Sequence, residues 1–188
     1  MDFILAQKTS DVFPFLKNRN VPGMLEGRDC DSTSAVALYR NVGDKIGAVI
    51  GLFEKPVSNT KAKIGEILHE MGHQVSDMFH KSIGVPFTET EGFTEAYLKD
   101  IKNLPENMKK YGKRVKGAEY GINLLTLGST PNQADKDGKA EAFAEIFAML
   151  NKKSISEQYS KGMDKLIRKI FPNTVAYTEK LLYLLGKR

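Results

Sequence analysis

The sequence contains a single cysteine, no tryptophan and only three histidines among its 188 residues. With Cys30 alone, no intramolecular disulfide can form and no cluster of thiolates can hold a zinc ion. Any metal that this chain binds must therefore be held by nitrogen and oxygen atoms of histidine, aspartate and glutamate side chains.

Long hydrophobic runs are also missing, since no apolar stretch approaches the ~20 residues that a membrane-spanning helix needs. The first residues include an acid, Asp2, and only a short apolar stretch, which differs from a secretory signal. We therefore expect no membrane insertion. The location stays open between the cytoplasm, export or injection by another route, and a virus particle.

Hydrophobic residues make up 41% of the chain and charged residues 27%, the balance of an ordinary globular domain. The net charge of +5 is modest. The basic residues fall in two groups, which are Lys109, Lys110, Lys113, Arg114 and Lys116, and then Lys161, Lys165, Arg168 and Lys169. We interpret both groups as solvated helix faces, and because no nucleic-acid-binding motif accompanies them we do not expect nucleic acid as a partner.

The pattern of apolar residues predicts an α+β chain that is mostly helical, with a small N-terminal sheet or hairpin. Residues 1–31 are taken as an N-terminal segment, with a short helix or turns over 1–30, and residues 32–188 as the main domain. Strands are predicted at 35–40 and 45–53, and helices at 61–80, 94–104, 107–125, 140–150 and 155–186. Pro105 is expected to end one helix, and Pro172 to break the last.

Two histidines four residues apart, His69 and His73, lie within the predicted helix 61–80. Residues at this spacing share one helix face, with Cβ atoms about 5–6 Å apart, so both imidazoles can reach one zinc ion. Glu70, next to the first histidine, can reach a water at the metal and act as a general base. Asp77, on the same helix, is a further candidate to support the ligands.

A catalytic zinc needs a third protein ligand and an open position. His80 cannot supply that ligand, since it lies two turns beyond the second histidine, about 10 Å along the helix. The predicted helix 140–150 carries Glu141 and Glu145 among alanine and phenylalanine residues. Because buried carboxylates need a charged partner, we expect one glutamate to bind the metal and the other to accept a hydrogen bond from a ligand histidine. Spacing alone leaves open which does which.

The stretches 68–73 and 140–148 together resemble the catalytic domain of anthrax lethal factor and the related Pro-Pro endopeptidases. In that family a histidine–glutamate–x–x–histidine helix is followed by a helix of alanine, phenylalanine and two glutamates. The similarity extends over residues 32–188 and includes 171–180, which looks like the family's closing segment. The resemblance implies a zincin-like fold, a zinc cofactor, and endopeptidase activity on a peptide or protein substrate.

The resemblance also implies a role for each acidic residue of the two motifs. Glu141 would be the third zinc ligand, Glu145 the support of a ligand histidine, and Glu70 the general base. In the mechanism that follows, Glu70 removes the proton of the attacking water and passes it to the leaving nitrogen. The strand around 46–53 is expected to pair with the extended substrate.

One position departs from the family pattern. The family has a tyrosine seven residues before the metal-binding glutamate, where it steadies the oxyanion or protonates the leaving amine. This chain has Ala134 at that position and no tyrosine between residues 127 and 140. Tyr120 is the candidate replacement and Tyr111 a second one, although each also fits a packing or surface role.

Two other functions remain open from the sequence. The first is a zincin-like scaffold with little or no turnover that serves as a structural or binding component of a larger assembly, for example a phage particle. The second is a basic nucleic-acid-binding protein in which the histidine motif is incidental. Motif specificity favours the peptidase over both.

Overall fold

The computed structural model describes the chain in several stretches, most of which are helical. These stretches are residues 2–6, 37–41, 48–53, 60–112, 115, 118–151 and 161–185. The mostly helical character predicted from the sequence is confirmed over these residues. Cys30 and the boundary predicted at residue 31 lie outside them.

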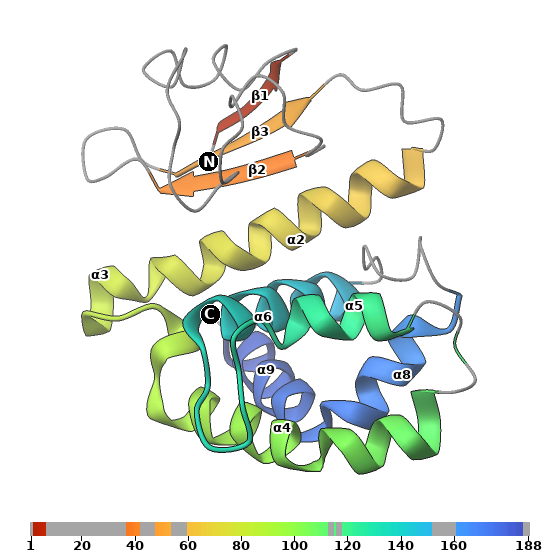
Figure 1. Cartoon of the computed structure of the whole chain (residues 1–188). Helices are drawn as coiled ribbons and strands as arrows, with labels where there is room; N and C mark the ends of the chain where they lie inside the picture. Colours follow the sequence, from red (N-terminus) through yellow and green to blue (C-terminus); the bar gives the residue numbers. More distant parts are fainter. Residues whose placement is uncertain are drawn as a thin grey trace.

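Three short strands, β1 (Asp2–Ala6), β2 (Ala37–Asn41) and β3 (Ala48–Phe53), form a sheet in the order β1-β3-β2 (Figure 1). β3 is parallel to β1 and antiparallel to β2. The prediction of a helix or turns over 1–30 is wrong at β1, because pairing with a distant strand leaves no local signal. The prediction that the strand at 46–53 pairs with a substrate is also wrong, because β3 is the central strand and both its edges are paired.

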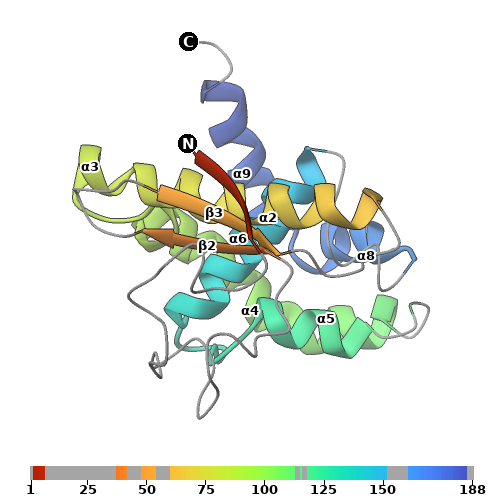
Figure 2. The ribbon, with the colours of Figure 1, turned by 90° about the horizontal axis from the view of Figure 1, so that it is seen from above.

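Helix α2 (Thr60–Met78) lies between this sheet and the remaining helices, as Figures 1 and 2 show together. It packs against β2 and β3 on one side and against α6 (Lys136–Leu150) on the other. The predicted helix 61–80 ends slightly early, and His80 begins a separate short turn, α3 (His80–Ile83), where it is exposed. α2 therefore has protein on two sides, which places its polar residues in the interior.

The other helices pack around α6, which is buried along most of its length. They are η3 (Phe87–Glu89), α4 (Glu91–Tyr111), α5 (Ala118–Leu125), α8 (Met163–Ile170) and α9 (Pro172–Leu185). The predicted break near Pro172 is confirmed, since this proline opens α9, where its missing N–H costs nothing. A cluster of aromatic rings from η3, α4, α6 and α9 fills the centre, and its members are Phe87, Phe93, Phe143 and Tyr177.

Pro105 does not end a helix as predicted, because α4 continues past it. The helix predicted for 107–125 is instead divided between the end of α4 and α5. Ile101, Leu104 and Met108 share one face of α4 and pack in the core. Their burial offsets the ~3 kcal/mol that an internal proline costs, so tertiary packing overrides local propensity.

A buried carboxylate from α4 holds the N-terminus of α9. Asp100, 1% exposed, accepts hydrogen bonds from the backbone N–H groups of Asn173 and Thr174 at 3.2 and 2.7 Å. The Asn173 Nδ2 and the Thr174 Oγ1 donate two more bonds, of 2.6 and 2.8 Å. Asp100 thus acts as a helix cap supplied from another helix, with its charge at the positive end of the α9 dipole.

Replacing Asp100 with alanine should lower the free energy of unfolding by about 3 kcal/mol, because four donors lose a buried charged acceptor. Urea unfolding followed by circular dichroism measures this loss. The control is Glu179→Ala, which removes an exposed ion pair with Arg168 of 2.9 Å and should cost less than about 1 kcal/mol. Equal losses in the two variants would contradict the capping role.

Candidate metal centre

Helices α2 and α6 approach each other closely at Gly72 and Ala144. A Cβ atom on Gly72 would lie 2.7 Å from the Ala144 Cα and 3.2 Å from the Phe147 Cβ, closer than atoms pack. Glycine on one helix and alanine on the other therefore allow the two backbones to come together. The polar side chains that this contact brings together are His69 and His73 from α2 and Glu141 and Glu145 from α6.

Three of these side chains converge on one point. The Nε2 atoms of His69 and His73 are 3.2 Å apart. One carboxylate oxygen of Glu141 lies 3.2 Å from the His69 Nε2, and the other lies 3.6 Å from the His73 Nε2. A tetrahedral zinc with bonds of about 2.0–2.1 Å keeps its ligand atoms roughly 3.3 Å apart. The three residues therefore have the separations of a metal-ligand set and can hold a metal ion.

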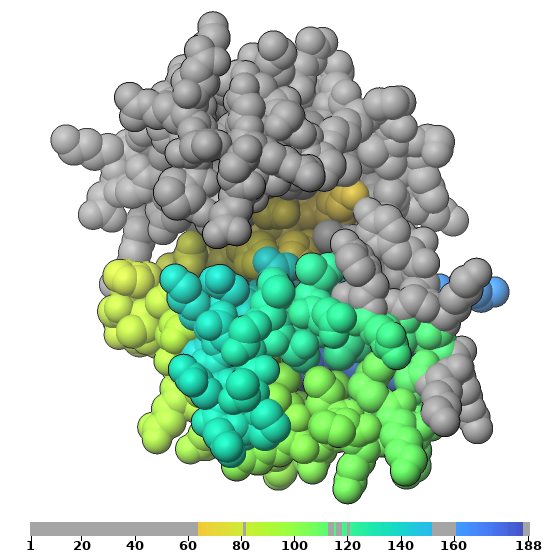
Figure 3. Space-filling model, viewed as in Figure 1, coloured from red at the N-terminus to blue at the C-terminus, as the bar shows by residue number. Residues whose placement is uncertain are grey.

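The ligand set is accessible from one side. The Glu141 side chain keeps 34% of its surface exposed, whereas the His69 and His73 side chains keep 10% and 18%. In the space-filling view, the atoms of α2 are set back behind those of α6, so the described surface is hollowed along α2 (Figure 3). Glu141 is therefore the most exposed member of the ligand set.

Glu145 supports the ligand set from behind. Its side chain is 2% exposed, and its Oε2 lies 3.3 Å from the Nδ1 of His69. When His69 is neutral and Nδ1–H donates to this carboxylate, its Nε2 keeps a lone pair for a metal. The two glutamates that spacing left undecided thus occupy different places, since Glu141 is the one that approaches both Nε2 atoms, as the resemblance implies.

The charges of the site are unevenly shared. Burial alone would lower the pKa of His69, but the hydrogen bonds that it donates to Glu141 and Glu145, and the charges of these carboxylates, outweigh burial and raise that pKa from 6.5 to about 10. Burial and the neighbouring His69 cation lower the pKa of His73 to about 4. Burial acts against ionisation of Glu141, yet its bond to His69 leaves its pKa lowered. Without a metal, His69 therefore carries a proton on both ring nitrogens, and His73 is neutral, between about pH 4 and about pH 10.

The remaining acidic candidates also lie on α2. Glu70 sits between the two ligand histidines and is half-buried. Asp77 lies one helical turn beyond His73 and is half-buried as well. Both acids lie on the helix that carries the two histidines, and their roles stay predictions.

The tyrosine candidates lie on α4 and α5. Tyr111, at the end of α4, is engaged by a lysine of α4 and a lysine of α8, so it belongs to a separate site. Tyr97 is fully buried and donates its hydroxyl to a backbone carbonyl of α5 at 2.9 Å. Ala134 packs against the core just before α6 begins. Tyr120 belongs to α5, which packs against α6, and its side chain lies outside the described part of the structure.

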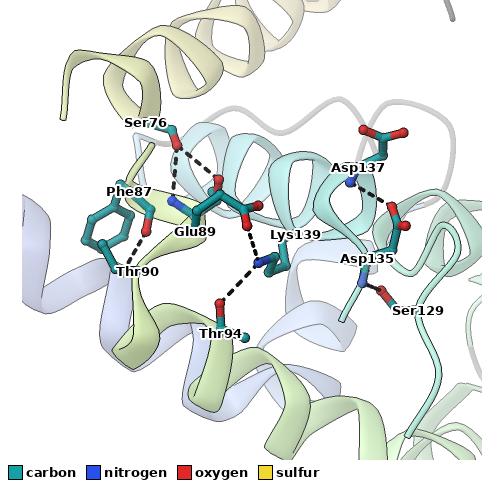
Figure 4. A network of polar contacts seen from close by, with 10 residues as sticks. Ser76, Phe87, Glu89, Thr90, Thr94, Ser129, Asp135, Asp137 and Lys139 are labelled. Carbon is teal, nitrogen blue, oxygen red and sulfur yellow. Dashed lines mark hydrogen bonds and ion pairs between the residues drawn. The ribbon is translucent and has the colours of Figure 1, made fainter. Parts of the chain in front are cut away.

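A polar network without a local signal in the sequence positions α2 and α6, the two helices that carry the candidate ligands. Lys139 of α6 is 4% exposed and donates to Glu89 at 2.9 Å and to Thr94 at 3.1 Å (Figure 4). Ser76 of α2 hydrogen-bonds to Thr88 at 3.2 Å in the same region. These bonds tie α2 and α6 to η3 and to the start of α4. Lysine is usually a surface residue, so its burial depends on partners that lie far away in the sequence.

Comparison of the chain with protein-family models, with curated proteins and with solved structures returns no match. Among the described helices, none is long and apolar enough to cross a membrane. Function is therefore inferred from the two motifs and from the geometry of the side chains that they bring together.

Replacing Gly72 with alanine should weaken zinc binding by roughly tenfold or more, because the new Cβ pushes α2 away from Ala144 and separates the ligands. It should also lower the free energy of unfolding by about 1–3 kcal/mol. Titration calorimetry with zinc measures the first effect, and urea unfolding measures the second.

The control is Gly84→Ala, where no atom lies within 4 Å. There the positive φ costs about 1 kcal/mol, and zinc affinity should stay unchanged. Unchanged zinc affinity in Gly72→Ala would contradict the close-contact argument.

Metal binding should release about one proton near neutral pH, because the metal must displace the proton that His69 holds up to about pH 10. The affinity for zinc should rise about tenfold per pH unit between about pH 6 and 8. His73 adds nothing in this range, since its lowered pKa leaves it neutral. Calorimetry in buffers of different ionisation enthalpy measures the number of protons. An affinity independent of pH would show that His69 is neutral in the metal-free protein.

Proposed function

We propose that this chain is a zinc-dependent endopeptidase with an α+β, zincin-like fold, similar to the catalytic domain of anthrax lethal factor and the Pro-Pro endopeptidases. One observation carries the proposal. The Nε2 atoms of His69 and His73 face the carboxylate of Glu141 at 3.2–3.6 Å, while Glu145 lies behind His69. Two motifs far apart in the sequence thus bring together the side chains that a zinc peptidase needs, which supports the proposal.

The donor set supports zinc as the metal. Two imidazoles and one carboxylate form the ligand set of catalytic zinc in well-known peptidases, and a fourth position stays open for water or substrate. A closed structural site takes four protein ligands, whereas the described residues supply three. Zinc bound here supplies a Lewis acid that polarises the scissile carbonyl and lowers the pKa of a water.

Glu70 is suited to move the proton. It is carried by the same helix as the histidines and follows the first of them directly in the sequence. It takes the proton of the attacking water and passes it to the leaving nitrogen, and the amine departs as the C–N bond breaks. Glu145 keeps His69 in orientation during these steps through its bond to Nδ1.

The sheet offers a place for the substrate on β2. This strand is at the edge of the sheet and packs against α2, the helix that carries the histidines (Figure 1). An extended peptide that adds to the edge of β2 away from β3, which no described strand pairs, would receive main-chain hydrogen bonds from the strand and lie close to α2. β2 therefore replaces β3 as the substrate strand in the proposal.

A second candidate is a zincin-like protein that holds the metal with little turnover and acts as a binding component of a larger assembly, such as a phage particle. The observation that favours it is Ala134 at the family's tyrosine position, packed against the core. Tyr97 and Tyr111 are also engaged away from the metal position. Metal binding is common to both candidates, so turnover separates them.

Replacing Glu70 with glutamine should leave zinc bound and slow peptide cleavage by roughly 10²–10⁴-fold, because the general base is lost while the ligands remain. Cleavage of a peptide library, followed by mass spectrometry, measures the rate, and elemental analysis measures the zinc. Glu95→Gln, which changes an exposed acid of α4, is the matched control and should cleave like the wild type.

The outcomes separate the candidates. Cleavage by Glu70→Gln at the wild-type rate would exclude Glu70 as the base. A wild-type protein that holds one zinc and cleaves no library peptide would favour the binding component. Loss of zinc in Glu141→Ala, with zinc retained in Glu95→Gln, is expected in both cases, because it tests the ligand set alone.

A further inference from the structure

A basic pocket lies on helices that take no part in the metal centre. Its volume is about 190 Å³, and its lining includes Tyr111, Val115, Lys161, Lys165, Leu166 and Lys169. Three lysines of the second basic group line it, and Lys110 of the first group contacts the ring of Tyr111. Within the first group, Lys113, Arg114 and Lys116 lie outside the described residues.

Tyr111 organises the cations of this pocket. The Nζ atoms of Lys110 and Lys169 each lie 5.0 Å from the centre of its ring, a distance at which a cation is attracted to an aromatic face. A hydrogen bond from Lys110, together with the charges of both lysines, lowers the pKa of Tyr111. One ring thus attracts ammonium groups from two helices, α4 and α8.

The positive charge of the pocket is not balanced by acids in its described lining. α8 contains one acid, Asp164, which is not part of that lining. Arg168 of the same helix pairs with Glu179 at 2.9 Å, so this acid is already engaged. The three lysines of the lining are exposed and carry their charge into solvent. An anionic ligand would therefore meet an uncompensated group of cations.

We propose that this pocket binds an acidic segment of a partner protein in extended conformation. Lys165 and Lys169 are one helical turn apart, about 6 Å along the axis. Acids at alternate positions of an extended chain lie about 6.6–6.8 Å apart on one face, so two such carboxylates can meet the two lysines. Val115 and Leu166 offer apolar contact to the side chains between the acids.

The structure favours a peptide over a nucleic acid at this pocket. Single-stranded nucleic acid binds by stacking its bases on open aromatic rings. Tyr111 is the aromatic residue of the lining, and its ring is already engaged by two ammonium groups. The pocket is formed by α4 and α8, so this binding does not depend on the metal centre or on cleavage.

The test uses the full chain and a fluorescent peptide with glutamate at alternate positions, with fluorescence anisotropy as the readout. The wild type should bind this peptide, and binding should weaken as salt is raised. The variant Lys165→Gln/Lys169→Gln should bind roughly tenfold more weakly, because it removes both charges that face the carboxylates. Lys99→Gln/Lys180→Gln removes two exposed lysines outside the pocket and should bind like the wild type.

Three results would overturn the proposal. These are equal binding of a peptide with glutamine in place of glutamate, unchanged binding by the Lys165→Gln/Lys169→Gln variant, and tighter binding of a single-stranded oligonucleotide of the same charge. Thermal unfolding of each variant, followed by circular dichroism, checks that the fold is kept. We expect it to be kept, because the substituted lysines are exposed. Zinc content should be the same in all variants.

Discussion

The contact between Gly72 of α2 and Ala144 of α6 is the constraint on which the candidate site depends. A metal-ligand set drawn from two helices needs their backbones close enough for the side chains to meet, and a Cβ atom at Gly72 would keep them apart. The imidazoles come from one side of this contact and the carboxylates from the other. The chemistry of the motifs thus depends on a close contact between two backbones.

Buried charges around this contact set the positions of the helices. Asp100 joins α4 to α9, Lys139 joins α6 to η3 and α4, and Glu145 joins α6 to His69 of α2. An unpaired charge in the interior costs several kcal/mol. Each pair is therefore satisfied in one relative position of its two elements, and other positions cost free energy. Apolar packing alone selects less strongly among the relative positions of two helices, because its free energy depends mainly on the area buried. The polar pairs therefore fix the positions of these helices relative to one another.

The metal centre and the basic pocket lie on different helices and differ in electrostatic character. At the candidate metal centre, two carboxylates surround a buried histidine and raise its pKa. At the basic pocket, lysines stay exposed around one tyrosine ring and keep a positive field at the surface. A partner protein that carries both an extended segment for β2 and an acidic segment would be held at two places, which increases its effective affinity.

The sequence by itself determined the features that depend on near neighbours. His69, Glu70 and His73 lie on one helix because apolar residues around them repeat at helical spacing, and Glu141 and Glu145 stand in a helix too apolar to face water. Tertiary structure decided the rest. It separated the positions of the two glutamates, carried α4 through Pro105, placed β3 at the centre of the sheet and buried Lys139. Each of these depends on contacts between residues that are distant along the chain, and such contacts leave no periodic pattern in the sequence.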